Sequence, residues 1–172
     1  MTFRIIVEGP DGSGKTQLIS WLALRLGFPI YPTQGPPKNP SEIVHRVISS
    51  LQLYGYIFDR FPLISQMVYG PILRDEYIFD NLWLNRFDDR DIIIYCRPPI
   101  GTILQNNLKV KPHKNQEHIQ KVNENRLKII NSYDDIMGKV SIHHRYFYLY
   151  NYLERTPEDL CAELTCVLGK AI

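Results

Sequence analysis

One stretch near the start of the sequence decides the fold of this chain: Gly9-Pro10-Asp11-Gly12-Ser13-Gly14-Lys15-Thr16. It matches the phosphate-binding pattern G-x-x-x-x-G-K-[ST]. The apolar run Ile5-Ile6-Val7 precedes it and a helix-like pattern over 17–26 follows it, which is the strand–loop–helix context that the motif requires. The sequence therefore predicts a loop that binds the phosphates of a nucleoside triphosphate.

Each residue type in this loop has a predicted contribution to nucleotide binding. The glycines let the backbone curl so that successive N–H groups converge on phosphate oxygens, and the N-terminus of the following helix favours negative charge. Lys15 is expected to reach the β- and γ-phosphates, and the Thr16 hydroxyl to ligate Mg²⁺. All of residues 9–16 are therefore candidates for binding the donor, with ATP and Mg²⁺ as the expected ligands.

The composition is that of one ordinary globular domain. The chain has 172 residues, of which 44% are hydrophobic and 22% are charged, and its formal net charge is +2. We expect a single domain over 1–172. The small net charge excludes a chain-wide field that would favour duplex nucleic acid.

Cysteine usage and hydropathy bear on the expected location of the protein. Cys96, Cys161 and Cys166 have no spacing typical of a metal site, so we expect reduced thiols and no structural metal. No secretory segment and no apolar run of about 18 residues is present. The sequence therefore predicts a cytoplasmic protein that does not associate with a membrane.

Apolar runs alternate with helical periodicity along the whole chain, which predicts a three-layer αβα fold with a five-stranded parallel sheet. The expected strands cover 4–8, 28–31, 56–59, 91–95 and 145–150. The expected helices cover 15–26, 41–53, 63–68, 76–87, 100–107, 117–137 and 157–168. Alternating tyrosines near the last strand, at 146, 148, 150 and 152, are expected to be structural.

A second element of the nucleotide site is indicated by Tyr56-Ile57-Phe58-Asp59, an apolar strand that ends in a carboxylate. This pattern is typical of a Walker B strand, which makes Asp59 a candidate Mg²⁺ ligand beside Thr16. Arg60 follows at once, and an arginine at the carboxyl end of a strand can bind a phosphate through two parallel hydrogen bonds. Asp59 and Arg60 together predict that the nucleotide bound by the loop donates a phosphoryl group to a second substrate.

The combination of Glu8–Thr16 with Asp59-Arg60-Phe61 resembles thymidylate kinases and related deoxynucleoside kinases, whose signatures are E-G-x-D-G-x-G-K-[ST] and D-R-[YF]. Two later runs, Ser65–Tyr69 and Ile92–Pro99, are similar to segments of the same family. The resemblance implies a nucleoside-monophosphate-kinase-like fold. It also implies that Asp11 approaches the acceptor sugar, that Arg60 binds the acceptor phosphate and the transferring group, and that Tyr69 lies near the acceptor nucleoside. Tyr69 has a second interpretation, as a core aromatic residue. The candidate catalytic residues are Lys15, Asp59, Arg60 and Asp11.

The chain departs from the family in two loops. No arginine follows the second expected strand, and the stretch 32–40 is either a linker or a wall of the acceptor pocket. The arginine-rich lid of the family is replaced by a short lid segment at about 105–118, which contains Lys109, Lys111 and Lys114. These lysines either stabilise the charge of the γ-phosphoryl group or belong to a solvated basic loop.

Two arginines outside the motifs are further candidates. Arg126 falls on the apolar stripe of its expected helix, so it needs a partner. That partner is either bound phosphate or, for a side chain that extends its head to the surface, water. Arg97 follows a strand at the same edge of the sheet and is a candidate phosphate ligand on that ground.

The leading prediction is an ATP-dependent kinase of a deoxynucleoside 5′-monophosphate, thymidylate or a related pyrimidine nucleotide. The first alternative is a deoxynucleoside kinase, in which Glu8 or Asp11 would act as the base for a hydroxyl acceptor. The second is a kinase of hydroxymethylated pyrimidine bases within DNA. The phosphate backbone of that DNA would bind along Lys38 and the lysine-rich segment 109–121.

A regulatory GTPase or ATPase is the alternative from a different class. The chain contains no guanine-reading Asn/Thr-Lys-x-Asp element, and Arg60 stands where a motor ATPase prefers a second acidic residue. The short chain without lid arginines favours a viral (phage) enzyme acting in the host cytoplasm. The sequence leaves a homodimer open.

Overall fold

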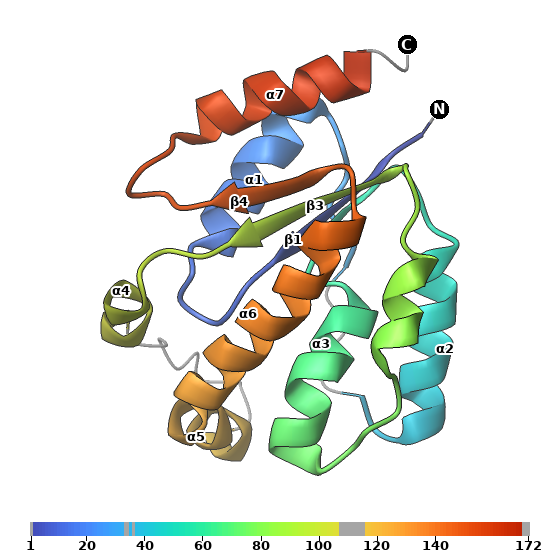
Figure 1. Ribbon diagram of the computed structural model, residues 1–172, viewed down its shortest axis with the longest axis vertical. Coiled ribbons are helices and arrows are strands. Elements are labelled where there is room, and N and C mark those ends of the chain that lie inside the picture. The colour runs from blue at the N-terminus through green and yellow to red at the C-terminus, as the bar shows by residue number, and fades with distance from the viewer. Residues whose placement is uncertain (1, 33–34, 36, 107–115, 170–172) are drawn as a thin grey trace.

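The computed structural model describes residues 2–32, 35, 37–106 and 116–169, and its centre is a parallel sheet (Figure 1). The sheet order is β2-β1-β3-β4, and the strands are β1 (Arg4–Glu8), β2 (Ile57–Asp59), β3 (Asp91–Cys96) and β4 (Phe147–Tyr150). Every residue of β1 and β3 is buried, as expected of parallel strands that are covered on both faces. The register pairs Val7 with Asp59 and Glu8 with Tyr95. The carboxyl ends of β1, β2 and β3 therefore meet at one edge of the sheet.

The predicted five-stranded sheet is corrected to four strands. The segment 28–31 forms only an isolated bridge, between Ile30 and Ile57, at the outer edge of β2. Tyr31 donates its N–H to Ile57 O at 2.8 Å, and Ile57 donates to Pro29 O at 2.9 Å. Because Pro29 has no N–H to donate to β2, the ladder does not extend toward the start of this segment. The other four predicted strands are confirmed, with small shifts at their ends.

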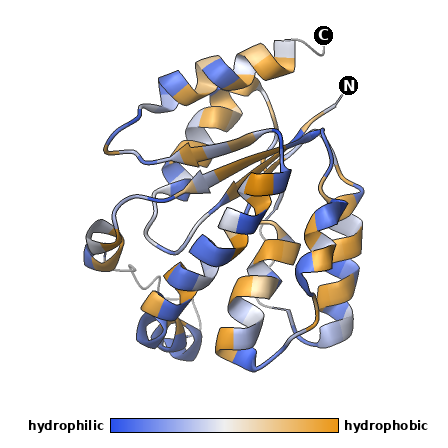
Figure 2. Cartoon of the chain, viewed as in Figure 1, coloured by the Kyte–Doolittle hydropathy of each residue, from blue (hydrophilic) through white to orange (hydrophobic). Residues whose placement is uncertain are grey.

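Helices cover both faces of the sheet, which confirms the predicted three-layer αβα fold (Figures 1 and 2). One face carries α1 (Lys15–Leu26) and α7 (Pro157–Gly169), and the other carries α2 (Pro40–Leu51), α3 (Pro62–Tyr69) and α6 (Arg126–His143). Alternate strand residues enter the two cores: Ile5 and Val7 pack with α1 and α7, and Ile6 packs with α3 and α6. None of the helices in the described ranges has the length and apolar character that crossing a bilayer requires.

The predicted helix over 76–87 is wrong. After α3 the chain makes a π-helical turn (Gly70–Arg74) and then, further on, a 3₁₀ helix (Asn81–Arg86). Asp80 caps the 3₁₀ helix by accepting the N–H of Leu82 at 3.0 Å, and the carboxylate of Glu76 is paired with Arg74 at 2.7 Å. Short polar side chains that bond to nearby backbone groups compete with helix formation, so the regular pattern starts late and stays short.

The predicted helix over 117–137 consists of two helices, α5 (Gln116–Glu124) and α6. Asn125 interrupts them with φ −110° and ψ 14°. Its side-chain amide donates to Lys121 O at 2.9 Å, and its backbone N–H contacts both Lys121 O and Val122 O at 3.2 Å, so the end of α5 is closed by local bonds at Asn125. The interruption makes Arg126 the first residue of α6. The short helix α4 (Ile100–Gln105) lies beyond the end of β3 (Figure 1).

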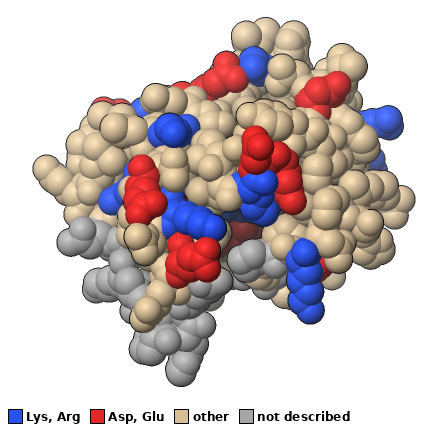
Figure 3. Space-filling view, turned by 90° about the horizontal axis from the view of Figure 1, so that it is seen from below, with Lys and Arg blue, Asp and Glu red and all other residues tan. Residues whose placement is uncertain are grey.

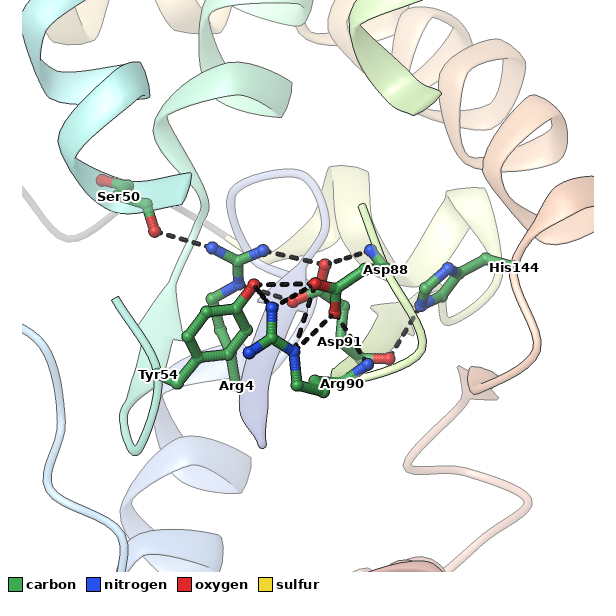
Figure 4. A network of polar contacts seen from close by, with 7 residues as sticks. All are labelled: Arg4, Ser50, Tyr54, Asp88, Arg90, Asp91 and His144. Atoms are coloured by element: carbon green, nitrogen blue, oxygen red, sulfur yellow. Dashed lines mark hydrogen bonds and ion pairs between the residues drawn. The ribbon is translucent and has the colours of Figure 1, made fainter. Parts of the chain in front are cut away.

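A buried ion pair ties the sheet together at the edge opposite the phosphate loop (Figure 4). Arg4 and Asp91 face each other in the register of β1 and β3, and neither side chain is exposed. Arg4 Nε and Nη2 donate to the two carboxylate oxygens at 2.6 and 2.8 Å, and Nη1 donates to Ser50 O at 2.6 Å. Around this pair lie Tyr54, Asp88, Arg90 and His144. Because buried charges require partners, the network holds α2 against the two central strands.

Candidate active site

The phosphate loop connects β1 to α1 at the carboxyl edge of the sheet (Figure 1). Gly9, Gly12 and Gly14 have φ values of 144°, 85° and 86°, a region in which other residues are strained. A Cβ added at Gly9 would lie 2.5 Å from Cys96 O, and one at Gly14 would lie 3.0 Å from the Tyr152 ring. The loop therefore needs these glycines both for its conformation and for close packing.

Lys15 begins α1, and its ammonium group turns back over the loop. Nζ donates to Pro10 O at 2.8 Å and lies 3.4 Å from Ser13 Oγ. Burial, together with the positive charge of Arg60, lowers the pKa of Lys15 to about 8. The hydrogen-bond partners of this buried cation are neutral oxygens, which phosphate oxygens can replace at a gain in charge compensation.

Asp11, Arg60 and Tyr69 join the phosphate loop to the turn after β2 and to α3. Arg60 Nη2 donates to Asp11 Oδ1 at 2.6 Å, and the Tyr69 hydroxyl donates to Asp11 Oδ2 at 3.1 Å. Burial acts to raise the pKa of Asp11, but the charges of Arg60 and Lys15 outweigh it and hold that pKa well below its usual range. Asp11 is therefore ionised, with both oxygens engaged.

Tyr69 is a core aromatic residue, as the second interpretation of the sequence has it. Its side chain is largely buried and packs edge-on against Tyr133, with 6.0 Å between the ring centroids. Its hydroxyl nevertheless reaches Asp11, and the guanidinium of Arg60 lies 5.3 Å from its ring centroid. Tyr69 is a core residue whose polar end belongs to the site. Its contact with an acceptor nucleoside stays a prediction.

The backbone at Arg60 is left-handed, with φ 67°. This region is uncommon for a residue with a side chain, and such strain concentrates at functional sites. Beneath this turn lies Glu8, a candidate base, which has no exposed surface and accepts the N–H of Phe61 at 2.5 Å. A carboxylate without exposed surface does not contact an acceptor hydroxyl, which leaves Asp11, 28% exposed, as the candidate base for a hydroxyl acceptor.

Thr16 and Asp59, the predicted Mg²⁺ ligands, lie at the same edge of the sheet. Thr16 is exposed in the first turn of α1, and Asp59 ends β2 next to Val7. A hydroxyl and a carboxylate are oxygen ligands that suit Mg²⁺. Among the described residues no group of three or more His, Cys, Asp or Glu side chains could hold a metal, so phosphate oxygens and water would complete its coordination. The two residues fit such an ion, and their assignment stays a prediction.

Arg97 follows β3, and its guanidinium is paired with a carboxylate on α6. Nε and Nη2 donate to the two oxygens of Asp134 at 2.7 and 2.8 Å, and the Tyr95 hydroxyl donates to the same carboxylate at 2.6 Å. This bidentate pair fixes α6 to the edge of the sheet and supplies a partner for Arg97 within the protein. The predicted contact of Arg97 with phosphate stays a prediction.

Arg126 binds the end of α4 beside the phosphate loop. Nη1 donates to Leu104 O at 3.1 Å, and Nη2 donates to Asn106 O at 3.0 Å and to the carbonyl oxygen of Ile103. The last carbonyls of a helix have no partners within it, so a cation there is favourable. Nη2 also lies 3.5 Å from the position of a Cβ added at Gly12. The structure thus gives Arg126 a partner that the sequence did not predict, within reach of the loop.

Two side chains that the sequence analysis did not assign to the site cover the phosphate loop. Asn106 Nδ2 donates to Gly12 O at 2.8 Å and to the Tyr152 hydroxyl at 3.3 Å, and the Tyr152 ring lies against Gly14. Tyr152 comes after the end of β4, so the strand alternation that makes its neighbours structural no longer applies to it. A large aromatic residue just beyond the carboxyl end of a parallel strand is the signal that could have identified it.

Most of the predicted lid lies outside the described residues, including Lys109, Lys111 and Lys114. On the described part of the face shown in Figure 3, basic and acidic side chains lie next to each other. Lys121, at the end of the lysine-rich segment, is paired with Glu117 at 2.9 Å. Within these described residues, nothing favours a basic track for DNA.

Comparisons with known proteins bear on the fold. No protein-family model matches the sequence, and no curated protein sequence matches it. The YorR protein from Bacillus subtilis, solved in complex with phosphorylated GDP, is similar with a TM-score of 0.73 and 18% identity, over 96% of this chain and 95% of that chain. Deoxyadenosine kinase from M. mycoides, solved with the products dCMP and dCDP, is similar with a TM-score of 0.61 and 17% identity, over 99% and 100% of the two chains.

Thymidylate kinase from Candida albicans is similar with a TM-score of 0.55 and 14% identity, over 99% of this chain and 92% of that chain. At these identities the likeness is one of fold, and it extends over nearly the whole length of each chain. The chain has the parallel α/β fold of the P-loop kinases.

Proposed function

We propose that this chain is an ATP- and Mg²⁺-dependent kinase that transfers the γ-phosphoryl group to a deoxynucleoside 5′-monophosphate, thymidylate or a related pyrimidine nucleotide. The observation that carries the proposal is the contact between Arg60 and Asp11 at 2.6 Å. A phosphate loop alone is common to kinases and NTP hydrolases. A guanidinium held against that loop from a neighbouring strand provides the additional cation that a phosphorylated acceptor needs.

The charges at this edge suit phosphoryl transfer, which requires positioning and neutralisation more than covalent chemistry. Lys15 would bind the donor phosphates, and Arg60 would bind the acceptor phosphate. A Mg²⁺ ion held by Thr16 and Asp59 would supply further positive charge at the donor phosphates. An oxygen of a monophosphate is a nucleophile at neutral pH, so this reaction needs no general base from the chain.

The ligands of the similar structures agree with this class of substrate. The M. mycoides enzyme was solved with a deoxynucleoside monophosphate and diphosphate, and the YorR protein with a phosphorylated nucleotide. Both similarities extend over almost all of this chain. Because dCMP is a product in the structure of a deoxyadenosine kinase, they support a deoxynucleoside or a deoxynucleotide as the acceptor.

A deoxynucleoside kinase is the second candidate, and the state of Asp11 favours it. Asp11 is ionised and partly exposed, so it could accept a proton from a hydroxyl acceptor. Its two protein partners, Arg60 and Tyr69, already engage both carboxylate oxygens. The charges of Arg60 and Lys15 hold the pKa of Asp11 well below its usual range, so it would be a weak base, which makes the monophosphate the first choice.

A phosphoryl-transfer screen tests these proposals. ATP and Mg²⁺ are supplied with deoxynucleosides, deoxynucleoside 5′-monophosphates or hydroxymethylated DNA, and labelled products are separated. Lys15→Ala serves as the inactive control. Transfer to monophosphates supports the first proposal, and transfer to deoxynucleosides alone supports the second. Hydrolysis of ATP that no acceptor stimulates would contradict both.

A further inference from the structure

Glu8 is the last residue of β1, immediately before the phosphate loop, and its carboxylate has no exposed surface. One oxygen accepts the N–H of Phe61 at 2.5 Å. The other oxygen has no hydrogen-bond partner within the described residues. Burial of a carboxylate costs free energy unless hydrogen bonds or charges compensate it. No step of the proposed reaction uses Glu8 directly.

The hydrogen bond from Phe61 acts on the turn that contains Arg60. Arg60 is left-handed, and two bonds to β1 flank it: Arg60 donates its N–H to Val7 O at 3.0 Å, and Phe61 donates to Glu8. A strained residue keeps its conformation only when the surrounding contacts determine it. Val7 O and the Glu8 carboxylate, on the buried strand β1, accept these two N–H groups and so fix the conformation of Arg60. From this turn the Arg60 guanidinium donates to Asp11 at 2.6 Å.

The charges around Glu8 fit the same role. Arg60 and Lys15 lie close enough to favour its ionised form, whereas burial and Asp59 oppose it. Tyr133 on α6 and Cys96 on β3 are the other titratable groups that interact with it. Burial dominates, so Glu8 holds its proton more readily than an ordinary glutamate. A carboxyl oxygen accepts the Phe61 N–H in either protonation state, so this bond does not depend on the charge.

We propose that Glu8 is the positioning residue for Arg60. Through its bond to the Phe61 N–H it fixes the left-handed turn, and the turn sets the distance of the guanidinium from the phosphate loop. The inference rests on the proposed function for its effect on catalysis, and on the geometry alone for its effect on the turn. It assigns Glu8 a role in use of the acceptor that is separate from binding of ATP.

A matched pair of substitutions separates the effect of the length of the Glu8 side chain from the effect of its charge. Glu8→Gln keeps the length of the side chain and an oxygen that accepts the Phe61 N–H, but removes the charge. Glu8→Asp keeps the charge but is too short to reach Phe61. Leu164→Ala is the control for a general loss of stability. It creates a cavity at a buried position of α7, which covers the other face of the sheet. Glu8→Ala replaces Glu8→Asp if the latter does not unfold cooperatively.

The first measurement is hydrogen exchange of the Phe61 amide, which requires no activity. We expect exchange to accelerate at least about tenfold in Glu8→Asp and to stay within about threefold of the wild-type rate in Glu8→Gln, beyond any change seen in Leu164→Ala. Unchanged protection of Phe61 in Glu8→Asp would overturn the proposal. This result holds even if the wild-type protein transfers phosphate to no acceptor, which would refute the proposed function only.

The second measurement is the kinetics of phosphoryl transfer. We expect the acceptor KM to rise, or kcat to fall, at least about tenfold in Glu8→Asp, while the KM for ATP changes less than about threefold. Glu8→Gln should restore acceptor use to near the wild-type value. Equal losses for ATP and acceptor, or a larger loss in Glu8→Gln than in Glu8→Asp, would show that Glu8 acts through stability or charge and would overturn the positioning role.

Discussion

Arg60 and Asp11 form an ion pair of 2.6 Å that joins the turn after β2 to the phosphate loop. Each side chain keeps about a quarter of its surface exposed, at 26% and 28%. The pair therefore orients the guanidinium without sealing it off. On the proposed function, an anionic acceptor would meet a cation already held beside the phosphate loop, which would lower the entropic cost of aligning the two substrates.

Replacing Arg60 should impair use of the acceptor far more than binding of ATP. For Arg60→Ala we expect kcat/KM for the acceptor to fall about a hundredfold or more, because the proposed contact of the guanidinium with the acceptor phosphate is lost. Arg60→Lys, which keeps the charge but not the two-pronged geometry, should give an intermediate loss. Steady-state kinetics with each substrate varied in turn would measure both. Unchanged acceptor parameters in Arg60→Ala would refute the assigned role.

Lys15→Ala should abolish transfer while leaving the fold intact. The Lys15 ammonium is buried against the loop that is expected to hold the donor phosphates, so we expect the transfer rate to fall about a thousandfold or more. Lys139→Ala is the matched control, because Lys139 lies on α6, is partly exposed and is paired with Asp135 within the same helix. A coupled assay for ADP measures the rates, and circular dichroism checks the fold. A Lys15→Ala enzyme with near-normal turnover would contradict the loop assignment.

The buried pair of Arg4 and Asp91 should show strong coupling in stability. Removing one partner, as in Arg4→Met or Asp91→Leu, leaves an uncompensated buried charge and should lower the free energy of unfolding by about 3–5 kcal/mol. The double variant should lose much less than the sum of the two, because both charges leave the interior together. Urea unfolding of the three variants measures this. Additive losses would mean that the pair contributes no coupling energy.

The pH dependence of stability should change when Glu8 is replaced by Gln. Burial raises the pKa of Glu8 from 4.5 to about 7, so between these values the folded state binds more protons than the unfolded state. The stability that this proton contributes is fully present below pH 4.5 and is lost as the pH rises through 7, by up to about 3 kcal/mol. Urea unfolding of both proteins at about pH 5 and about pH 8 would detect it. Wild-type protein should lose stability over this range relative to Glu8→Gln, and parallel pH profiles would contradict the assignment.

Much of the fold follows from local patterns in the sequence. The central strands β1 and β3 are continuous apolar runs that can be stable only when both faces are covered, and α1 is bounded by the loop on one side and by Gly27, with φ 72°, on the other. The errors arose where a single side chain overrides a periodic pattern. Asn125 divides one predicted helix by bonding to the end of the helix before it, and Pro29 limits the pairing of a predicted strand to a bridge.

The sequence by itself determined the phosphate-loop motif, because eight consecutive residues carry both the bend of the loop and its charge. It also placed Asp59 and Arg60 at the same edge, since parallel strands end together. Only the tertiary structure decided the partners of the remaining polar groups. Arg97 meets Asp134, Arg126 meets the end of α4, and Tyr152 covers Gly14. These contacts join residues that are distant in the chain, so no local pattern records them.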